Sequence, residues 1–306
     1  MNVREWALPV YTILVQLAVG TLTVLWISRG LSRSRGDFPL LDRLTRGSLL
    51  IVFVTTCAGM IGSHFHLSRP LISFLAILNV GSSWLSREIL FSVLFLLGTA
   101  GLLYLEWFVP QRARLKEGLG WLAVVLGWAC VYCMGRIYLI PSQPVWDSSF
   151  TLLSFFATTL LLGLVTFPLI TVLQLTFLHL QHPGQDEPEA NLLGKTLNAI
   201  APAVLILAIA VIVLNGQQLR SLSQGQAAAQ AGLGLLLGPY RGLLIFRLAA
   251  MSVGAAVLCF VVVRAHRQAP SAQELGTPLF VACLFVLLGE ILGRFLFYAT
   301  HVRVGI

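Results

Sequence analysis

The residue types best suited to chemistry gather where long apolar segments end. In the stretch from Gly62 to Leu90, His66 and Arg69 follow one apolar segment, and Glu88 opens the next. A neutral imidazole and a carboxylate can each accept a proton near neutral pH, so this pair suits proton-transfer chemistry. Ionisable groups beside membrane-length apolar segments are costly, and the cluster therefore predicts a site for a lipid-soluble substrate.

A second set of ionisable and polar side chains lies along the last apolar segment. Glu290, Arg294, Tyr298 and His301 follow one another at intervals of four, four and three residues. Side chains at these intervals share one face of a helix, so this face is expected to point into a helix bundle. Glu290 and Arg294 can also form an ion pair with a purely structural role, and that alternative stays open.

Further ionisable groups lie near those ends of the other apolar segments that would reach the same side of the membrane as His66 and Glu88. Arg136 and Tyr138 stand near the end of the fourth segment, and Arg247 stands near the start of the seventh, whereas Glu106 is the main such group at the other level. A charge in hydrocarbon costs about 2.5–3.5 kcal/mol or more on insertion scales. The one-sided collection therefore predicts a polar pocket in one leaflet, although each Arg and Tyr could instead serve contacts between helices.

The composition shows what kind of elements must position these groups. Of 306 residues, 57% are hydrophobic and 10% are charged, and the mean hydropathy is +0.87, whereas soluble domains carry about 25% charged residues. We expect an all-α polytopic membrane protein with one domain over residues 1–306 and eight transmembrane helices. The expected helices cover about 7–28, 47–67, 86–108, 118–140, 149–178, 196–215, 241–263 and 278–300.

The orientation of this bundle follows from its basic residues. The connections after the first, third, fifth and seventh segments carry 11 Lys and Arg residues, and the residues on the other side carry 4. The positive-inside rule places the first set in the cytoplasm, so both termini and the polar pocket face outward, to the periplasm of a bacterium. On that side, a short interfacial helix is expected within 216–240, above the pocket.

Several other classes are disfavoured by the sequence. The net charge of +8 resides mainly in loops, and no nucleic-acid-binding module is present. The five cysteines all lie within apolar segments, and Cys130 and Cys133 form a C-x-x-C without the second pair that an iron–sulfur cluster needs. No metal site is expected in this chain.

Several sequence fragments resemble the membrane-anchor subunit of the dimethyl sulfoxide reductase family (the DmsC family), a heme-free relative of the NrfD-type quinone-interacting anchors. These fragments occur in order along nearly the whole chain. They are HLSRP at 66–70, NVGSSWLSREI at 79–89, GRIY at 135–138, PVW at 144–146 and LLGEILGRFLFYATH at 287–301.

This resemblance implies a place in a three-subunit respiratory complex of the bacterial inner membrane. A catalytic subunit would carry molybdopterin, and a second subunit would carry four [4Fe–4S] clusters. The anchor would tether both and oxidise menaquinol, with His66 and Glu88 in the quinol site. Two positions depart from the family's pattern, since Ser68 stands where Gly is expected and Arg69 where a small residue is more usual.

The expected roles of the site residues follow from the needs of quinol oxidation. His66 would contact one hydroxyl group, and Glu88 would take a proton and pass it outward. The arginines would hold carboxylates in place or stabilise the partly oxidised ring, and the tyrosines would orient it. The outer loops at 68–84 and 141–148 are expected to receive the iron–sulfur subunit.

Three alternatives stay open beside this interpretation. A b-type heme could be held by His64 or His66 together with His301. A transporter or ion-translocating subunit would place polar groups at the midplane and often has inverted repeats, which are not visible here. An inert tether would need no ionisable cluster in the membrane at all.

Overall fold

The computed structural model describes residues 3–33, 38–64, 70–181, 186–268, 271–300 and 302. The regular structure in these ranges is helical throughout, as expected for long apolar segments whose backbone groups must be paired within lipid. The elements are α1 (Val3–Arg33), α2 (Phe38–His64), η1 (Pro70–Asn79, a 3₁₀ helix), α3 (Trp84–Phe108), α4 (Ala113–Arg136), α5 (Ser149–Gln181), α6 (Asp186–Gln224), α7 (Ala227–Leu237), α8 (Arg241–Gln268) and α9 (Ala272–Ala299).

Eight of these helices are long and apolar enough to cross a membrane, which confirms the predicted all-α bundle of eight spans. The largest boundary difference concerns α6, which continues to Gln224 although the sequence predicted an end at 215. The polar run Asn215, Gly216 and Gln217 resembles a helix stop. The helix nevertheless continues through it, and the Asn215 amide donates to the Val211 carbonyl one turn earlier (2.7 Å).

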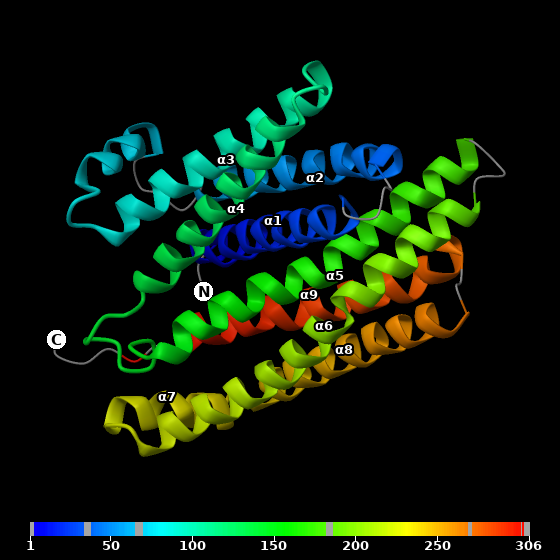
Figure 1. Cartoon of the computed structure of the whole chain (residues 1–306). Coiled ribbons are helices and arrows are strands. Elements are labelled where there is room, and N and C mark those ends of the chain that lie inside the picture. The colour runs from blue at the N-terminus through cyan, green and yellow to red at the C-terminus, as the bar shows by residue number, and fades with distance from the viewer. Residues whose placement is uncertain are drawn as a thin grey trace.

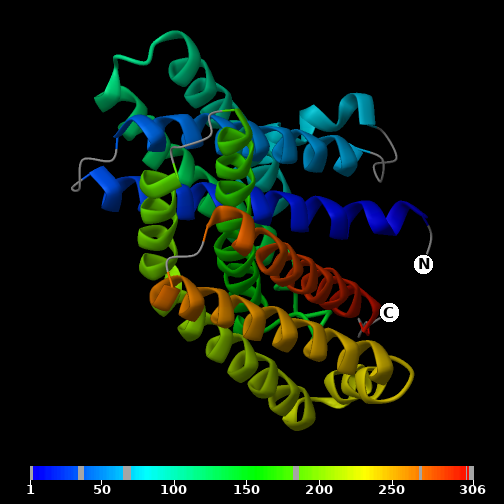
Figure 2. The ribbon, with the colours of Figure 1, turned by 90° about the vertical axis from the view of Figure 1, so that its right-hand side faces the viewer.

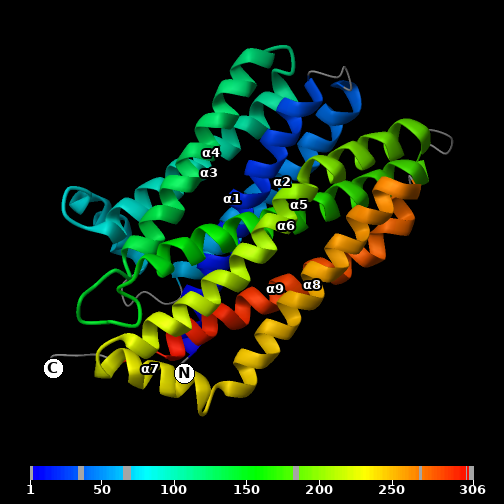
Figure 3. The same ribbon diagram turned by 60° about the horizontal axis from the view of Figure 1, so that its bottom comes forward.

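Helices α1 and α5 form the centre of the bundle. About 78% of the apolar membrane-spanning stretch of each helix is buried inside the bundle, a larger share than in any other candidate span among the described residues. Helices α2, α3 and α4 lie on one side of this central pair, and α6, α8 and α9 lie on the other (Figures 1 and 3). Groups that project from α1 and α5 can therefore contact both sides.

The two central helices cross in backbone contact at a pair of glycines. A Cβ atom added at Gly20 would overlap the Thr159 carbonyl oxygen, and one added at Gly163 would overlap the backbone of Gly20. Small residues allow such close approach between membrane helices. The crossing therefore fixes the position, relative to α5, of the α1 residues that lie one and two turns before Gly20.

One end of the bundle carries the start of α1, the end of α9, η1 and α7 (Figures 1 and 2); we call it the terminal end. The short helix expected within 216–240 is confirmed as α7. Its Leu236 joins a small buried apolar cluster with Val145, Leu222 and Leu296. This cluster closes the terminal end between α6, α9 and the turns that follow α4.

The opposite end holds a buried ion cluster that the sequence did not predict. Arg29 lies 2.8 Å from Asp42 and 3.5 Å from Glu106, and Lys116 donates to Glu106 at 3.0 Å. Arg29 and Lys116 were expected to be loop cations, but both are buried. This expectation is wrong because opposite charges from α1 to α4 meet there, and their pairing offsets the loss of hydration.

Candidate functional site

Three buried polar residues of α1 lie between the two predicted parts of the site. Tyr11, Thr12 and Gln16 are each at most 6% exposed, near the terminal end of the bundle. Tyr11 faces α3, whereas Thr12 and Gln16 face α9. None of the three carries a charge, so sequence reasoning missed them. Their spacing within one apolar segment is the signal that could have found them.

Glu88 lies one turn inside α3, whose start is capped by the Ser83 side chain. It is 5% exposed, and its carboxyl group lies within interaction range of the Tyr11 hydroxyl. That hydroxyl also exchanges a hydrogen bond with Ser92 (2.8 Å), which in turn contacts the Cys130 thiol (3.1 Å). No ion pair with a described cation is found at Glu88, so its neighbours there are hydroxyl and thiol groups.

Arg294 is held on α9 by groups from both central helices. Its Nη2 donates to Gln16 Oε1 (2.7 Å), and Gln16 Nε2 donates to the Phe155 carbonyl (2.8 Å). The guanidinium carbon lies 3.8 Å from the centre of the Phe155 ring, a distance that allows cation–π attraction. The crossing at Gly20 and Gly163 brings these side chains together, because it lies one turn from Gln16.

Two tyrosines join the end of α4 to α9. The hydroxyl groups of Tyr138 and Tyr298 are hydrogen-bonded to each other. Their rings pack with Trp146 and Phe297, and Trp146 Nε1 donates to the Phe297 carbonyl (2.8 Å). Glu88 lies within electrostatic range of both tyrosines. The tyrosines therefore tie the segment after α4 to α9, within electrostatic range of Glu88.

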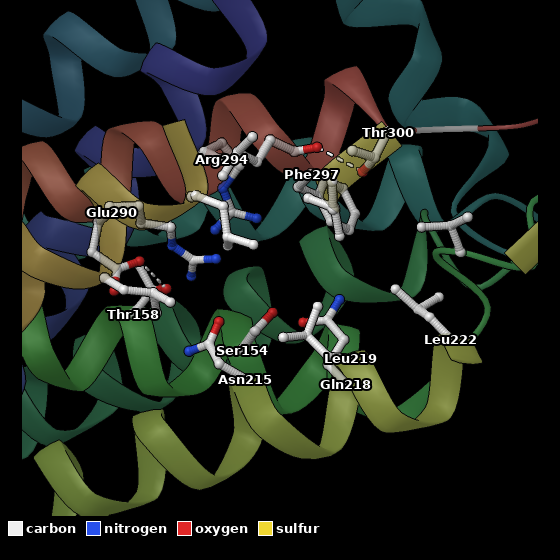
Figure 4. Close-up of a pocket in the computed structure, with 17 residues that line it drawn as sticks. Ser154, Thr158, Asn215, Gln218, Leu219, Leu222, Glu290, Arg294, Phe297 and Thr300 are labelled. Carbon is white, nitrogen blue, oxygen red and sulfur yellow. Dashed lines mark hydrogen bonds between the residues drawn. The ribbon is translucent and has the colours of Figure 1, made fainter. Parts of the chain in front are cut away.

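Glu290 and Arg294 do not form the ion pair that the sequence allows. No nitrogen–oxygen distance of 4.0 Å or less joins these two described residues, and each is bonded to another helix instead. Glu290 accepts a hydrogen bond from Thr158 of α5 (2.6 Å). Its carboxylate faces a cavity that Arg247 of α8 also lines (Figure 4).

Arg136 lies apart from the other arginine of the predicted site. Its guanidinium stacks over the Trp84 ring at 4.8 Å, and Arg87 stacks over the same ring at 4.3 Å. Arg87 is further fixed by bonds to the Val80 and Gly81 carbonyls (both 2.8 Å). Within the described residues, neither Arg136 nor Arg294 is paired with a carboxylate, so the expected role of holding carboxylates in place is not seen.

Three predicted site residues, His66, Arg69 and His301, lie outside the described residues. His64 is described, and its Nδ1 bonds to the Met60 carbonyl (2.8 Å) while the ring is exposed. The heme alternatives that use His66 or His301 therefore fall outside the described ranges as well.

No cluster of three or more His, Cys, Asp or Glu that could hold a metal ion occurs among the described residues. All five cysteines are free, and Cys130 and Cys133 are both buried in α4. Cys130 contacts Ser92 and the Glu88 carbonyl, so it belongs to the packing around Glu88.

The family model of the DMSO reductase anchor subunit (DmsC) matches residues 1–300. The chain belongs to the DmsC family. It is 29% identical over 309 residues to the anaerobic dimethyl sulfoxide reductase chain YnfH of Escherichia coli (strain K12), in a match that covers 99% of this sequence and 96% of that protein. It is equally similar, with the same coverage, to the C subunit of the anaerobic dimethyl sulfoxide reductase of that organism. The C subunit of the Haemophilus influenzae (strain Rd) enzyme is 27% identical over 320 residues, with 100% and 98% covered.

Membership of the DmsC family gives the protein a membrane-anchor role. Together with eight apolar helices, it indicates a multi-pass protein of the bacterial inner membrane. The anchor role also implies a catalytic subunit and an iron–sulfur subunit as partners in a DMSO reductase complex. The polar site at the terminal end is thus part of an anchor rather than of the catalytic subunit.

Proposed function

We propose that this DmsC-family protein binds and oxidises menaquinol at the terminal end of the bundle. Electrons would pass to a four-cluster iron–sulfur subunit and from there to a molybdopterin catalytic subunit. The observation that carries the proposal is the environment of Glu88. This carboxyl group is buried beside the Tyr11 hydroxyl, and Tyr138 and Tyr298 lie within its electrostatic range.

The chemistry requires groups that accept protons and groups that hold the ring. Oxidation of a quinol to a quinone releases two electrons and two protons. Glu88 is the proposed acceptor for a proton from one hydroxyl group, and Tyr11 orients its carboxyl group. Arg294, fixed by Gln16, supplies positive charge at the other side, where the electron-rich ring gains from it.

His66, Arg69 and His301 complete the proposal from sequence. His66 would contact the second hydroxyl group and relay its proton, since imidazole exchanges protons near neutral pH. Arg69 and His301 are assigned to the rim of the same site. Arg136, stacked on Trp84, would support the entrance of the site rather than its carboxylates.

We further propose that the terminal end faces the periplasm and receives the iron–sulfur subunit. The surplus of basic residues in the connections at the opposite end supports this orientation. At the terminal end, η1 exposes the apolar side chains of Leu75 and Leu78, and the turns at 141–148 lie beside Tyr138. An iron–sulfur cluster of a subunit docked on these segments would be close to the proposed quinol site.

The experiment compares Glu88→Gln with the matched variant Glu274→Gln in the complete complex. Glu274 lies at the opposite end, is exposed and pairs with Arg264 (2.7 Å). We expect Glu88→Gln to lower quinol-driven turnover about a hundredfold or more, as for loss of a positioned acid–base group. Glu274→Gln should retain wild-type turnover. Reduction of the catalytic subunit by an artificial one-electron dye should be equal in all three proteins, which controls for assembly.

Three results would contradict the proposal. Equal quinol-driven turnover in Glu88→Gln and wild type would remove Glu88 from the reaction. A wild-type complex that uses the dye but never a quinol would indicate an inert tether. Solute uptake into proteoliposomes without any electron donor would instead favour a transporter.

A further inference from the structure

A polar cavity lies between α5, α6, α8 and α9 in the terminal half of the bundle. It encloses about 70 Å³, and a water molecule needs roughly 10–15 Å³ of such space. Figure 4 shows Glu290 and Arg294 of α9 on one side of this space and Asn215 and Gln218 of α6 on the other. The cavity is therefore large enough for several water molecules.

Two facing stripes of uncharged polar residues line this cavity. Ser154 and Thr158 are four residues apart on α5, and Asn215 and Gln218 are three apart on α6, so each pair shares one helix face. Thr158 donates to Glu290 (2.6 Å), whereas the Asn215 amide donates to the backbone of its own helix. Polar stripes at membrane depth mark hydrated or ion-conducting paths more often than lipid contacts.

Two further spaces adjoin this cavity, one beside Glu290 and one at the terminal end. One, of about 30 Å³, is lined by Ser154, Asn215 and Glu290. The other, of about 120 Å³, is lined by Asp147 and opens between the turns at 141–148, the end of α6 and the start of α7. Gln218 lines all three spaces, so a row of cavities runs from Glu290, past Gln218, to the turns at 141–148.

The deep end of this row holds charged groups with unused hydrogen-bonding capacity. The Nε atoms of Arg247 and Arg294 are buried and find no partner among the described residues. Gly293 leaves room for this arrangement, because an added Cβ would lie 2.6 Å from Arg247 Nε. Both arginines lie within electrostatic range of Glu290. Water in the cavity is the natural partner for these buried donors.

We propose that these spaces form a water-filled proton route between Glu290 and the aqueous phase at the terminal end. The source of the protons rests on the proposed oxidation of quinol. As a quinol becomes a quinone, two electrons pass to the iron–sulfur subunit, and Glu290 takes up the proton that His66 relays from the second hydroxyl group. It gives that proton to cavity water, which restores the carboxylate, while Glu88 handles the other proton on the α3 side.

The first test measures water access independently of quinol chemistry. Single cysteines replace Asn215, which lines the cavity, and Val213, which lies two residues away and is 52% exposed on the outside of the bundle. A small charged methanethiosulfonate is added from the side that bears the N-terminus, with wild type as the baseline for native cysteines. We expect Asn215→Cys to be labelled and Val213→Cys to remain unlabelled. Labelling of Asn215→Cys no greater than that of Val213→Cys would overturn the route.

The second test measures proton flow in the complete complex. Gln218→Leu should remove water from the point where the three spaces meet. Gln217→Leu changes the neighbouring, exposed side chain and serves as the control. We expect the first variant to lower quinol-driven turnover and raise its solvent deuterium isotope effect, with an unchanged KM, and the second to match wild type. Equal kinetics in both variants would refute proton flow through this row.

The two tests separate the route from the proposed function. Labelling of Asn215→Cys in a protein that never oxidises quinol would refute the function and the proton-carrying role but leave a hydrated cavity. Quinol oxidation without labelling of Asn215→Cys would refute the route and leave the function intact. Glu290→Gln should lower turnover about a hundredfold if its carboxylate carries a proton in each cycle.

Discussion

Replacement of Gln16 by Leu tests whether α1 positions the charge of the site. The substitution removes the bond from Arg294 to Gln16 Oε1 (2.7 Å) and the bond from Gln16 to the Phe155 carbonyl (2.8 Å). A hydrogen bond to a charged group contributes about 1.5–3 kcal/mol in soluble proteins, whereas bonds between membrane helices average about 0.6 and reach about 1.7 kcal/mol. We therefore take about 1.4 kcal/mol as the expected loss, which corresponds to a tenfold weaker affinity for quinol.

The assay is the binding of a fluorescent menaquinol analogue to membranes, followed by thermal unfolding of the same samples. Gln16→Leu should raise the Kd of the analogue about tenfold. Gln16→Glu keeps an acceptor for Arg294 and should recover most of that affinity. Gln174→Leu is the matched control, since Gln174 donates to Ser48 (3.1 Å) towards the opposite end of α5. It should lower the unfolding temperature but leave the Kd unchanged.

One outcome would refute this reasoning directly. If Gln16→Leu lowers the unfolding temperature as Gln174→Leu does and leaves the Kd at its wild-type value, Gln16 serves helix packing alone. Arg294 would then need no support from α1 to bind the quinol.

Three further predictions concern the crossing of α1 and α5, the buried ion cluster at the opposite end, and Tyr138. Gly163→Val should abolish accumulation of the protein in membranes, seen by immunoblot, because its side chain would enter the backbone of α1, whereas Gly30→Val, with open space around it, should accumulate normally. Lys116→Met should lower the free energy of unfolding by about 1–3 kcal/mol, because Glu106 Oε2 loses its buried hydrogen-bond donor and Arg29, at 3.5 Å, is the cation that remains near this carboxylate. The double variant with Glu106→Leu should recover most of it, and a failure to recover would contradict the pairing. Tyr138→Phe should weaken analogue binding less than Gln16→Leu, since it removes one neutral hydrogen bond of about 0.5–1.5 kcal/mol.

The parts of the fold that follow from apolar length could be predicted, and so could the burial of two charged residues of the candidate site. Glu88 and Arg294 stand out in sequence because charge is rare in membrane segments, and both prove to be buried at the terminal end. Gln16 was missed because it carries no charge, although its spacing from Tyr11 and Thr12 in the same apolar segment was a usable signal. Its role depends on the crossing at Gly20 and Gly163, which no linear pattern reveals.

Depth and pairing were the least predictable features. Lys116 was counted with the loop cations because sequence alone cannot show that Glu106 from the preceding helix reaches it. Glu290 and Arg294 share a helix face as predicted, yet Thr158 and Gln16 from other helices bind them instead of each other. Helix periodicity fixes which side chains point together, but neighbouring helices decide what they contact.

The most direct test of quinol binding at the terminal end is saturable binding of the fluorescent menaquinol analogue to membranes that contain the wild-type protein, Glu88→Gln or Glu274→Gln. The proposal predicts saturable binding to wild type and Glu274→Gln, and binding to Glu88→Gln that is abolished or strongly weakened. Equal binding to all three, or binding to none, would contradict it and leave the polar cluster as a structural contact between helices.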